Sequence, residues 1–286
     1  MELALKIRNY IIYPLLLLTF LFTPDAVSTE TAKLISTDTF VMDNALIMGQ
    51  GITTDGEYYY TSGTITAVNI TALGKYTVDG MEFVDKNINP LPAVCKERGN
   101  NHIGGISYYN GKIYAPVEGG DEVPACIVVF DAETLKATGE VYDLPADAFP
   151  DGVPWCAVDS ATGYLYASKW KDTKSIYVYD VNDGMKLVKE LKLSGYSPIK
   201  RIQGGEFFGG TLYLSQDTNT NGKIRNILSV DVESGEVAVV AERNIGSEKF
   251  EAEGMTFTQG EDGAVMHVLD YNKTIGIFVH HYSVDF

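Results

Sequence analysis

The sequence has few basic residues for its length. Its 286 residues include 22 Lys and Arg but 38 Asp and Glu, which gives a formal net charge of −16 at pH 7. Nucleic acids and anionic membrane surfaces carry the same sign of charge and would repel such a chain. We therefore expect no nucleic-acid partner, and we expect cations or neutral and basic ligands to be accommodated more easily.

Cysteine is also scarce, with only Cys95, Cys126 and Cys156 in the chain. An odd number allows at most one internal disulfide bond and leaves one thiol. Cys95 and Cys126 flank one predicted hairpin, so we expect that pair, although the sequence leaves the other pairings open. Cys156 has no His or basic residue beside it, which favours a buried, inert thiol over a nucleophile.

Several catalytic motifs are missing altogether. The sequence has no Ser-centred nucleophile elbow, P-loop, dinucleotide fingerprint, HExxH or CxxC. The enzyme classes that depend on those motifs therefore have no support in the sequence.

A long apolar run occurs at Ile11–Phe22, after Lys6 and Arg8 and before an Ala26-Val27-Ser28 cleavage site. This layout is typical of a secretory signal peptide, which we assign to residues 1–28. The run is shorter than the roughly 20 residues that span a bilayer, and an uncleaved signal anchor is the alternative. We expect a secreted, periplasmic or extracellular protein without membrane contact after cleavage, whose residues 29–286 form one domain.

The chain does contain a unit that occurs five times. The copy at Asn101–Pro116, NHIGGISYYNGKIYAP, predicts a β-hairpin, since Asn110-Gly111 supplies the positive φ angles of a tight turn. The second positions of the copies are Gly51, Gly105, Cys156, Gly205 and Gly254, at steps of 54, 51, 49 and 49 residues. A period of about 50 residues predicts an all-β fold, a single β-propeller of five four-stranded blades.

A second repeated feature is an Asp at the end of a β-branched or aromatic run, at Asp131, Asp180 and Asp231. An Asp side chain in this place accepts hydrogen bonds from the backbone of the following turn. We therefore interpret these residues as turn caps that lie outside the functional site.

The last unit, residues 253–286, has room for only three strands. Because a ring of blades has to hide its edges, we expect the N-terminal segment 34–48 to supply the outer strand of the last blade and close the circle. Segments 85–101 and 144–155 contain prolines and run into predicted inner strands. We expect both to be long loops over one face of the ring.

Loops held by a rigid scaffold converge where the inner strands begin around the central channel. Polar or aromatic candidates precede the inner strand in every blade, namely Gln50, Asn101, His102, Asp151, Trp155, Arg201, Gln203, Glu251 and Glu253. We expect His102, Asp151 and Glu253 to face one cavity. Glu253 and His102 are the candidate catalytic residues, and the candidate ligand-binding residues are Gln50, Asn101, Trp155, Arg201 and Gln203.

Carboxylate and amide oxygens are the ligands that hard cations prefer. Asp151, Glu253 and Asn101 are therefore the candidate ligands for Ca²⁺ or another divalent cation. The alternative is that these side chains line a wet channel and hydrogen-bond one another without any cofactor. His102 precedes Gly104 and Gly105, which leave room for a ligand or for another backbone.

The stretches QGITTDGEYYYTSG from Gln50 and EGMTFTQGEDGAVMHVLD from Glu253 resemble the inner-strand pattern of the five-bladed glutamine cyclotransferase (glutaminyl cyclase) family. This resemblance implies that Glu253 shuttles a proton for an N-terminal glutamine, that Trp155 shapes the pocket and that no metal is needed. The middle blades depart from the pattern, since they open with Gly104-Gly105, Trp155-Cys156 and Gly204-Gly205.

The blade rhythm is more loosely similar to YncE-like and SMP-30/gluconolactonase-like propellers. The lactonase-like resemblance implies a divalent ion at Glu253, Asp151 and an Asn of Asn100–Asn101, which polarises an ester carbonyl and activates water. The sequence thus predicts a monomeric propeller that binds a small molecule, peptide or glycan at the channel mouth. A binding module of unknown ligand is the first interpretation. The alternatives are a divalent-metal-dependent lactonase- or esterase-like hydrolase and a glutaminyl cyclase-like acyltransferase.

Overall fold

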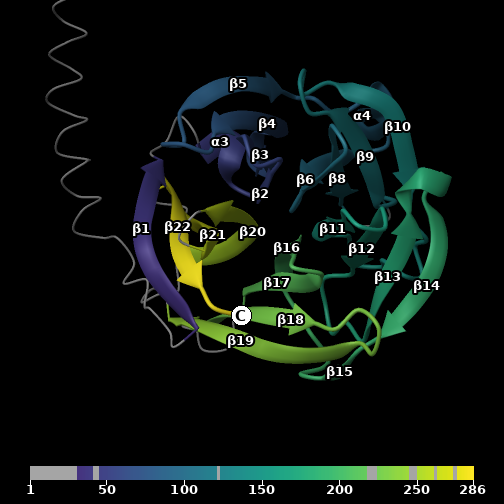
Figure 1. The fold of residues 1–286 in the computed structure, drawn as a ribbon. Helices are drawn as coiled ribbons and strands as arrows, with labels where there is room; N and C mark the ends of the chain where they lie inside the picture. Colours follow the sequence, from purple (N-terminus) through teal and green to yellow (C-terminus); the bar gives the residue numbers. More distant parts are fainter. Residues whose placement is uncertain are drawn as a thin grey trace, which may run out of the picture.

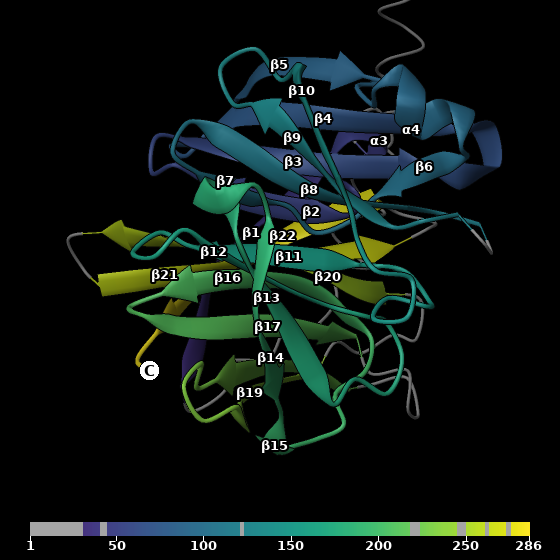
Figure 2. The same cartoon turned by 90° about the vertical axis from the view of Figure 1, so that its right-hand side faces the viewer.

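The computed structural model describes residues 31–40, 45–120, 123–217, 224–244, 250–260, 263–272 and 276–286. Five small β-sheets stand around a common axis (Figure 1), and Figure 2 shows the same ring after a quarter turn. This confirms the five-bladed, all-β propeller that the repeat period predicted. Within the described ranges no helix is long and apolar enough to cross a membrane. The predicted signal peptide, residues 1–28, lies outside them.

In each of the first four blades the strands follow one another from the axis to the periphery. Blade 1 contains β2 (Gly51–Thr54), β3 (Tyr58–Ile65), β4 (Ile70–Thr77) and β5 (Phe83–Ile88). Blade 2 has a split inner strand, β6 (Asn100–Ile103) and β7 (Ser107–Tyr109), followed by β8 (Lys112–Gly119), β9 (Cys126–Asp131) and β10 (Ala137–Asp143). Blade 3 contains β11 (Trp155–Asp159), β12 (Tyr164–Ser168), β13 (Ser175–Asp180) and β14 (Lys186–Lys192).

Blade 4 contains β16 (Ile202–Phe208), β17 (Thr211–Asp217), β18 (Ile224–Val230) and β19 (Glu236–Asn244), with the short β15 (Ser194–Gly195) parallel to β19 at the outer edge. The connections include the short helices α3 (Ala45–Met48) and α4 (Ala93–Glu97) and the 3₁₀ turns η2 (Thr66–Val68) and η3 (Val181–Asp183). Segment 144–154 is irregular, as expected. The prediction that 85–101 is a long loop is wrong, because this segment contains the end of β5, α4 and the start of β6.

Blade 5 joins the two ends of the chain. It contains β20 (Phe250–Gly260), β21 (Gly263–Asn272) and β22 (Gly276–Val284), with β1 (Ala32–Phe40) as its outer strand. β1 is antiparallel to β22, from Ala32 opposite Val284 to Phe40 opposite Ile277. The predicted closure is therefore confirmed, since β1 covers the edge of β22. Its extent differs, because the strand ends at Phe40 and Ala45–Met48 forms the helix α3 instead.

The hydrophobic core lies between neighbouring blades. Tyr60 of blade 1 packs with Ile113 and Phe130 of blade 2, and Trp155 of blade 3 packs with Leu214 of blade 4. Side chains alternate along a strand, so each blade presents an apolar face to both of its neighbours. This packing places the inner strands side by side around the axis.

The three repeated Asp residues cap turns, as predicted. Oδ1 of Asp131, Asp180 and Asp231 accepts hydrogen bonds of 2.8–2.9 Å from backbone N–H groups two or three residues later. Each carboxylate thus accepts hydrogen bonds from the turn that follows its own strand, and this turn lies toward the periphery of the blade.

All three cysteines are free and buried. Interaction with the Cys126 thiol lowers the pKa of Cys95 to about 7, but the disulfide bond expected between the two residues is not formed. Cys156 Sγ donates a hydrogen bond to the carbonyl oxygen of Tyr114 at 3.3 Å. Burial raises the pKa of the Cys156 thiol, which agrees with the inert thiol predicted for it.

Candidate functional site

The inner strands begin at one face of the ring, and we call the end of the central channel at this face the mouth. A ring of glycines at the start of these strands forms its floor. A Cβ added to Gly51, Gly105, Gly204 or Gly254 would lie 2.5–2.8 Å from backbone atoms of another blade, and one on Gly104 would meet the carbonyl of Pro154 more closely still. These distances are shorter than any ordinary van der Waals contact, so only glycine fits. The room beside His102 is thus filled by backbone.

Gln50 fixes the orientation of His102 through one hydrogen bond, and a second hydrogen bond fixes Gln50 itself. Gln50 Nε2 donates to the carbonyl oxygen of Gly49 at 2.8 Å, which leaves Gln50 Oε1 2.5 Å from His102 Nε2. Because Oε1 only accepts, the proton of the neutral imidazole lies on Nε2. Burial within the mouth lowers the pKa of His102 to about 4. At neutral pH, Nδ1 is therefore an unprotonated acceptor.

Glu118, at the end of β8, faces that acceptor. Its Oε1 lies 3.9 Å from His102 Nδ1, and the two side chains keep 24% and 31% of their surfaces exposed. Its Oε2 accepts a 2.9 Å hydrogen bond from the backbone N–H of Val153. Burial raises the pKa of Glu118 to about 7, and the nearby Asp151 acts in the same direction against the hydrogen bond from Val153. The mouth therefore holds an acid and a base that do not touch each other.

Asp151 and Arg201 belong to the loops around the mouth, which we call its rim. The Asp151 carboxylate accepts hydrogen bonds from the backbone N–H groups of Trp170 and Lys171 at 3.3 and 2.9 Å. The guanidinium of Arg201 lies over the Trp170 ring, 4.8 Å from its centroid. Asp151 thus ties the loop before β11 to the loop after β12 and sets the position of Trp170 beneath Arg201.

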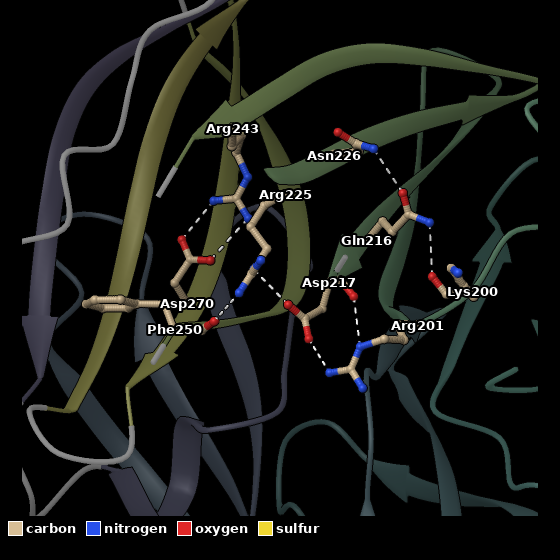
Figure 3. Close-up of polar contacts among 9 residues, drawn as sticks. All are labelled: Lys200, Arg201, Gln216, Asp217, Arg225, Asn226, Arg243, Phe250 and Asp270. Atoms are coloured by element: carbon tan, nitrogen blue, oxygen red, sulfur yellow. Dashed lines mark hydrogen bonds and ion pairs between the residues drawn. The ribbon is translucent and has the colours of Figure 1, made fainter. Parts of the chain in front are cut away.

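Two buried ion pairs hold the side chain of Arg201 in place (Figure 3). Arg201 binds the carboxylate of Asp217, which also pairs with Arg225 Nε at 2.7 Å. Arg225 in turn donates to the backbone carbonyl of Phe250 at the start of β20. Such a chain loses its stabilising effect if one partner is removed, because a charge then remains buried without its counter-charge. It therefore joins blade 4 to blade 5 and holds Arg201 in one orientation.

Another buried ion pair connects the same two blades (Figure 3). Arg243 binds both oxygens of Asp270 at 2.7 and 3.1 Å, and His280 Nε2 lies 3.3 Å from Asp270. Arg243 and Asp270 are fully buried. This pair therefore connects blade 4 to blade 5 and is closed to solvent.

Glu253 is fully enclosed beside these charges. It is 1% exposed, and its Oε1 has no hydrogen-bond partner among the described residues. Burial raises its pKa well above the usual range, and the negative charges of Glu251, Asp217 and Asp270 add to the effect. Glu253 is therefore a buried carboxyl whose protonated form is favoured by its surroundings, close to the mouth but covered.

The other sequence candidates lie in different surroundings. Trp155 is 0% exposed within the core and donates to Ser168 Oγ at 3.0 Å. Asn101 faces away from His102 and lines a polar cavity of about 220 Å³ with Asn69 and Asn89. The backbone carbonyl of Gln203 belongs to the glycine floor. Gln50, His102 and Arg201 thus remain at the mouth, whereas Trp155 packs between blades.

Among the described residues, no group of three or more His, Cys, Asp or Glu side chains is arranged to hold a metal ion. The carboxylate of Asp151 is engaged with Trp170 and Lys171, and Asn101 lines the separate polar cavity. A divalent cation at Asp151, Glu253 and Asn101 stays a prediction.

Sequence reasoning missed Glu118, Trp170 and Asp217. All three lie at or just after the end of the second strand of a blade. Since the second strand returns to the face where the inner strand begins, its last residues reach the same mouth. Reading forward from each second strand, as well as backward from each inner strand, would have found them.

No family model and no curated protein matches the sequence. The solved structures it resembles include the glutaminyl cyclase of Myxococcus xanthus, with a TM-score of 0.60, 13% identity, and coverage of 89% of this chain and 97% of that one. A mutant of the GH43 protein BlXynB from Bacillus licheniformis gives a TM-score of 0.55 at 12% identity, over 87% of this chain and 57% of that one. The Bacteroides ovatus xyloglucan PUL protein GH43B gives 0.53 at 15%, over 86% and 56%. At these identities the likeness establishes that the chain has the five-bladed propeller fold.

Proposed function

We propose that the protein is a binding module that takes the amino or amide group of a small molecule or peptide at the channel mouth, between His102 and Glu118. The observation that supports this most directly is the 3.9 Å separation of His102 Nδ1 from Glu118 Oε1. The gap is too long for a hydrogen bond, and both atoms belong to partly exposed side chains. An N–H donor placed between them would bond to both.

The proposed site favours a cationic amine. Glu118 has a pKa of about 7 in the free protein, so an ammonium group beside it would favour the ionised carboxylate and release a proton. His102 Nδ1 accepts a second N–H from the same group. Affinity for an ammonium group should therefore rise from about pH 6 to about pH 7.5 and fall again as the amine itself loses its proton, and binding below that maximum should release protons to the buffer.

A glutaminyl cyclase-like acyl transfer is the second candidate. The fold match to a glutaminyl cyclase covers 97% of that chain, and the mouth holds a base and an acid as such a reaction requires. For an N-terminal glutamine, the α-amine would attack the side-chain amide carbon. His102 would accept the amine proton, and Glu118 would donate a proton to the departing ammonia. Glu118 takes this role because it is exposed, whereas Glu253 is covered.

The test uses glutaminyl-alanine amide, a peptide with a free amine and no carboxylate. Calorimetry at pH 8 should show saturable binding, and Glu118→Gln or His102→Ala should weaken it about tenfold, the effect of losing one charge-assisted hydrogen bond. Asp180→Asn, a turn change at the periphery, is the control and should bind normally. Binding without ammonia release supports the binding module, and release that depends on Glu118 supports the cyclase. Equal affinity in all four proteins would reject the site.

A further inference from the structure

Arg201 adopts a backbone conformation that is unusual for its residue type. Its φ angle is +56°, in the left-handed region that costs a non-glycine residue roughly 1–2 kcal/mol. Two backbone hydrogen bonds hold it there, from Arg201 N–H to Trp170 O at 3.0 Å and from Asp217 N–H to Arg201 O at 2.8 Å. Glycine would adopt this conformation without strain. Leu135 and Met185 adopt the same region, so the role of Arg201 follows from its side-chain contacts.

The guanidinium uses only part of its hydrogen-bonding capacity. Of its five N–H donors, Nε–H binds the Asp217 carbonyl oxygen at 2.9 Å and one Nη2–H binds the Asp217 carboxylate. The other three have no acceptor within the part of the chain that the structure describes. The side chain keeps 27% of its surface exposed, and its flat face lies on Trp170. Arg201 is thus a fixed cation with a free edge at the mouth.

Its neighbours cannot play the same part. The side chain of Arg225 is 3% exposed and that of Arg243 is 0% exposed, so neither reaches solvent. Because Arg225 and Asp217 hold Arg201 from behind (Figure 3), little side-chain freedom is lost when a ligand binds the free edge. A planar fork of N–H groups matches a carboxylate or a phosphate in bidentate fashion. The carboxylate is the anion that an amino acid or a peptide carries together with its amine.

We propose that Arg201 binds a carboxylate of the ligand, and that the ligand is therefore a zwitterion of the amino-acid or short-peptide type. The amine end rests on the proposed function of His102 and Glu118, whereas the carboxylate end rests on Arg201 alone. Asp151 joins the two halves of the rim, since it holds the Trp170 loop and lies next to Glu118. The mouth thus offers an acceptor pair on one side and a cation on the other.

Two small molecules that each carry only one of the two charged groups test the carboxylate site and the amine site separately, and we call them half-ligands. N-acetylalanine has a carboxylate and no amine, and alaninamide has an amine and no carboxylate. Each is titrated into the intact protein at constant ionic strength, with calorimetry and tryptophan fluorescence as readouts. The chain has two Trp, and Trp155 is fully buried, so a change in emission on binding reports on Trp170.

N-acetylalanine should bind the wild type and change the emission of Trp170, and Arg201→Met should weaken it about tenfold or more. Arg201→Lys keeps the charge but not the fork and should bind with intermediate affinity. Lys112→Met, at the start of β8 and away from the mouth, is the matched control and should bind normally. If Arg201→Met does not fold, the wild-type emission change and the Lys variant still decide the question.

The outcomes distinguish the two proposals. N-acetylalanine binding that depends on Arg201, without alaninamide binding, supports the carboxylate site and rejects the amine site. Alaninamide binding alone, or N-acetylalanine binding that is unchanged in both Arg201 variants, overturns the carboxylate site. Alanine, dialanine and trialanine vary the distance between amine and carboxylate. If the two ends belong to one site, one of the three should bind more tightly than either half-ligand, and affinities no higher than that of N-acetylalanine for all three would reject the zwitterion.

Discussion

Glu206 offers a sharp test of how the channel is built. It lies on β16, beyond the glycine ring as seen from the mouth, and its carboxyl links three blades. Oε2 accepts hydrogen bonds from Thr53 Oγ1 at 2.9 Å and from Thr256 Oγ1 at 3.2 Å, and Oε1 accepts from the N–H of Phe207 at 3.0 Å. Burial nevertheless raises its pKa from the usual 4.5 to about 7, against these hydrogen bonds.

This pKa makes stability depend on pH in a defined direction. Between pH 4.5 and about pH 7 the folded protein keeps the Glu206 proton that the unfolded chain has lost, so the free energy of unfolding falls as pH rises. An interval of about 2.5 pH units at 1.36 kcal/mol per unit corresponds to ~3 kcal/mol. Glu206→Gln removes this group, because the amide resembles a protonated carboxyl at every pH. We expect the variant to gain ~3 kcal/mol on the wild type between pH 4.5 and pH 8.

Urea unfolding at several pH values, followed by circular dichroism, measures that gain. The pKa values of His102, His267 and His280 are lowered to about 4, about 3 and about 4, and they reduce stability as pH falls below 6.5. Their contribution cancels in the difference between the two proteins. Glu97→Gln, at an exposed position, is the control. A wild-type to Glu206→Gln difference that is the same at pH 5 and pH 8 would refute the reasoning.

Three further predictions concern the ring and its thiols. Gly254→Ala should lower the free energy of unfolding by about 3 kcal/mol, because its Cβ would lie 2.6 Å from Ile52 N, whereas Gly120→Ala has open space and should be neutral; equal stabilities would contradict the tight ring. Deleting residues 29–40 should expose the edge of β22 and cause aggregation or a lower melting temperature, and a stable, monomeric product on size exclusion would argue against the closure. Oxidised glutathione should join Cys95 to Cys126, because interaction with Cys126 lowers the pKa of the Cys95 thiol to about 7 and a thiolate is the reactive form. Non-reducing mass spectrometry should find this bond unchanged in Cys156→Ser; a bond to Cys156 would show that the thiols are misplaced.

The sequence by itself determined the architecture. The repeat period, the Asn-Gly and Asp turns and the three-stranded last unit were enough to predict five blades closed by the N-terminal strand. These features depend on interactions within a few residues, where turn geometry and side-chain alternation leave few choices. The sequence also named Gln50, His102 and Arg201 as residues of the mouth, because inner strands of a propeller start at one face.

Only the tertiary structure decided what each candidate does there. Neighbouring residues of a strand face opposite sides, so Asn101 and His102 separate, and their directions follow from the pairing of β6 with β8. Glu118 approaches His102, and Arg225 supports Arg201 through Asp217, across hydrogen-bond registers that local propensity does not encode. The burial of Trp155 and Glu253 and the free edge of Arg201 result from contacts between blades about 50 or more residues apart. Such contacts depend on the closed ring as a whole, which is why the chemistry of the mouth could not be predicted from the repeats.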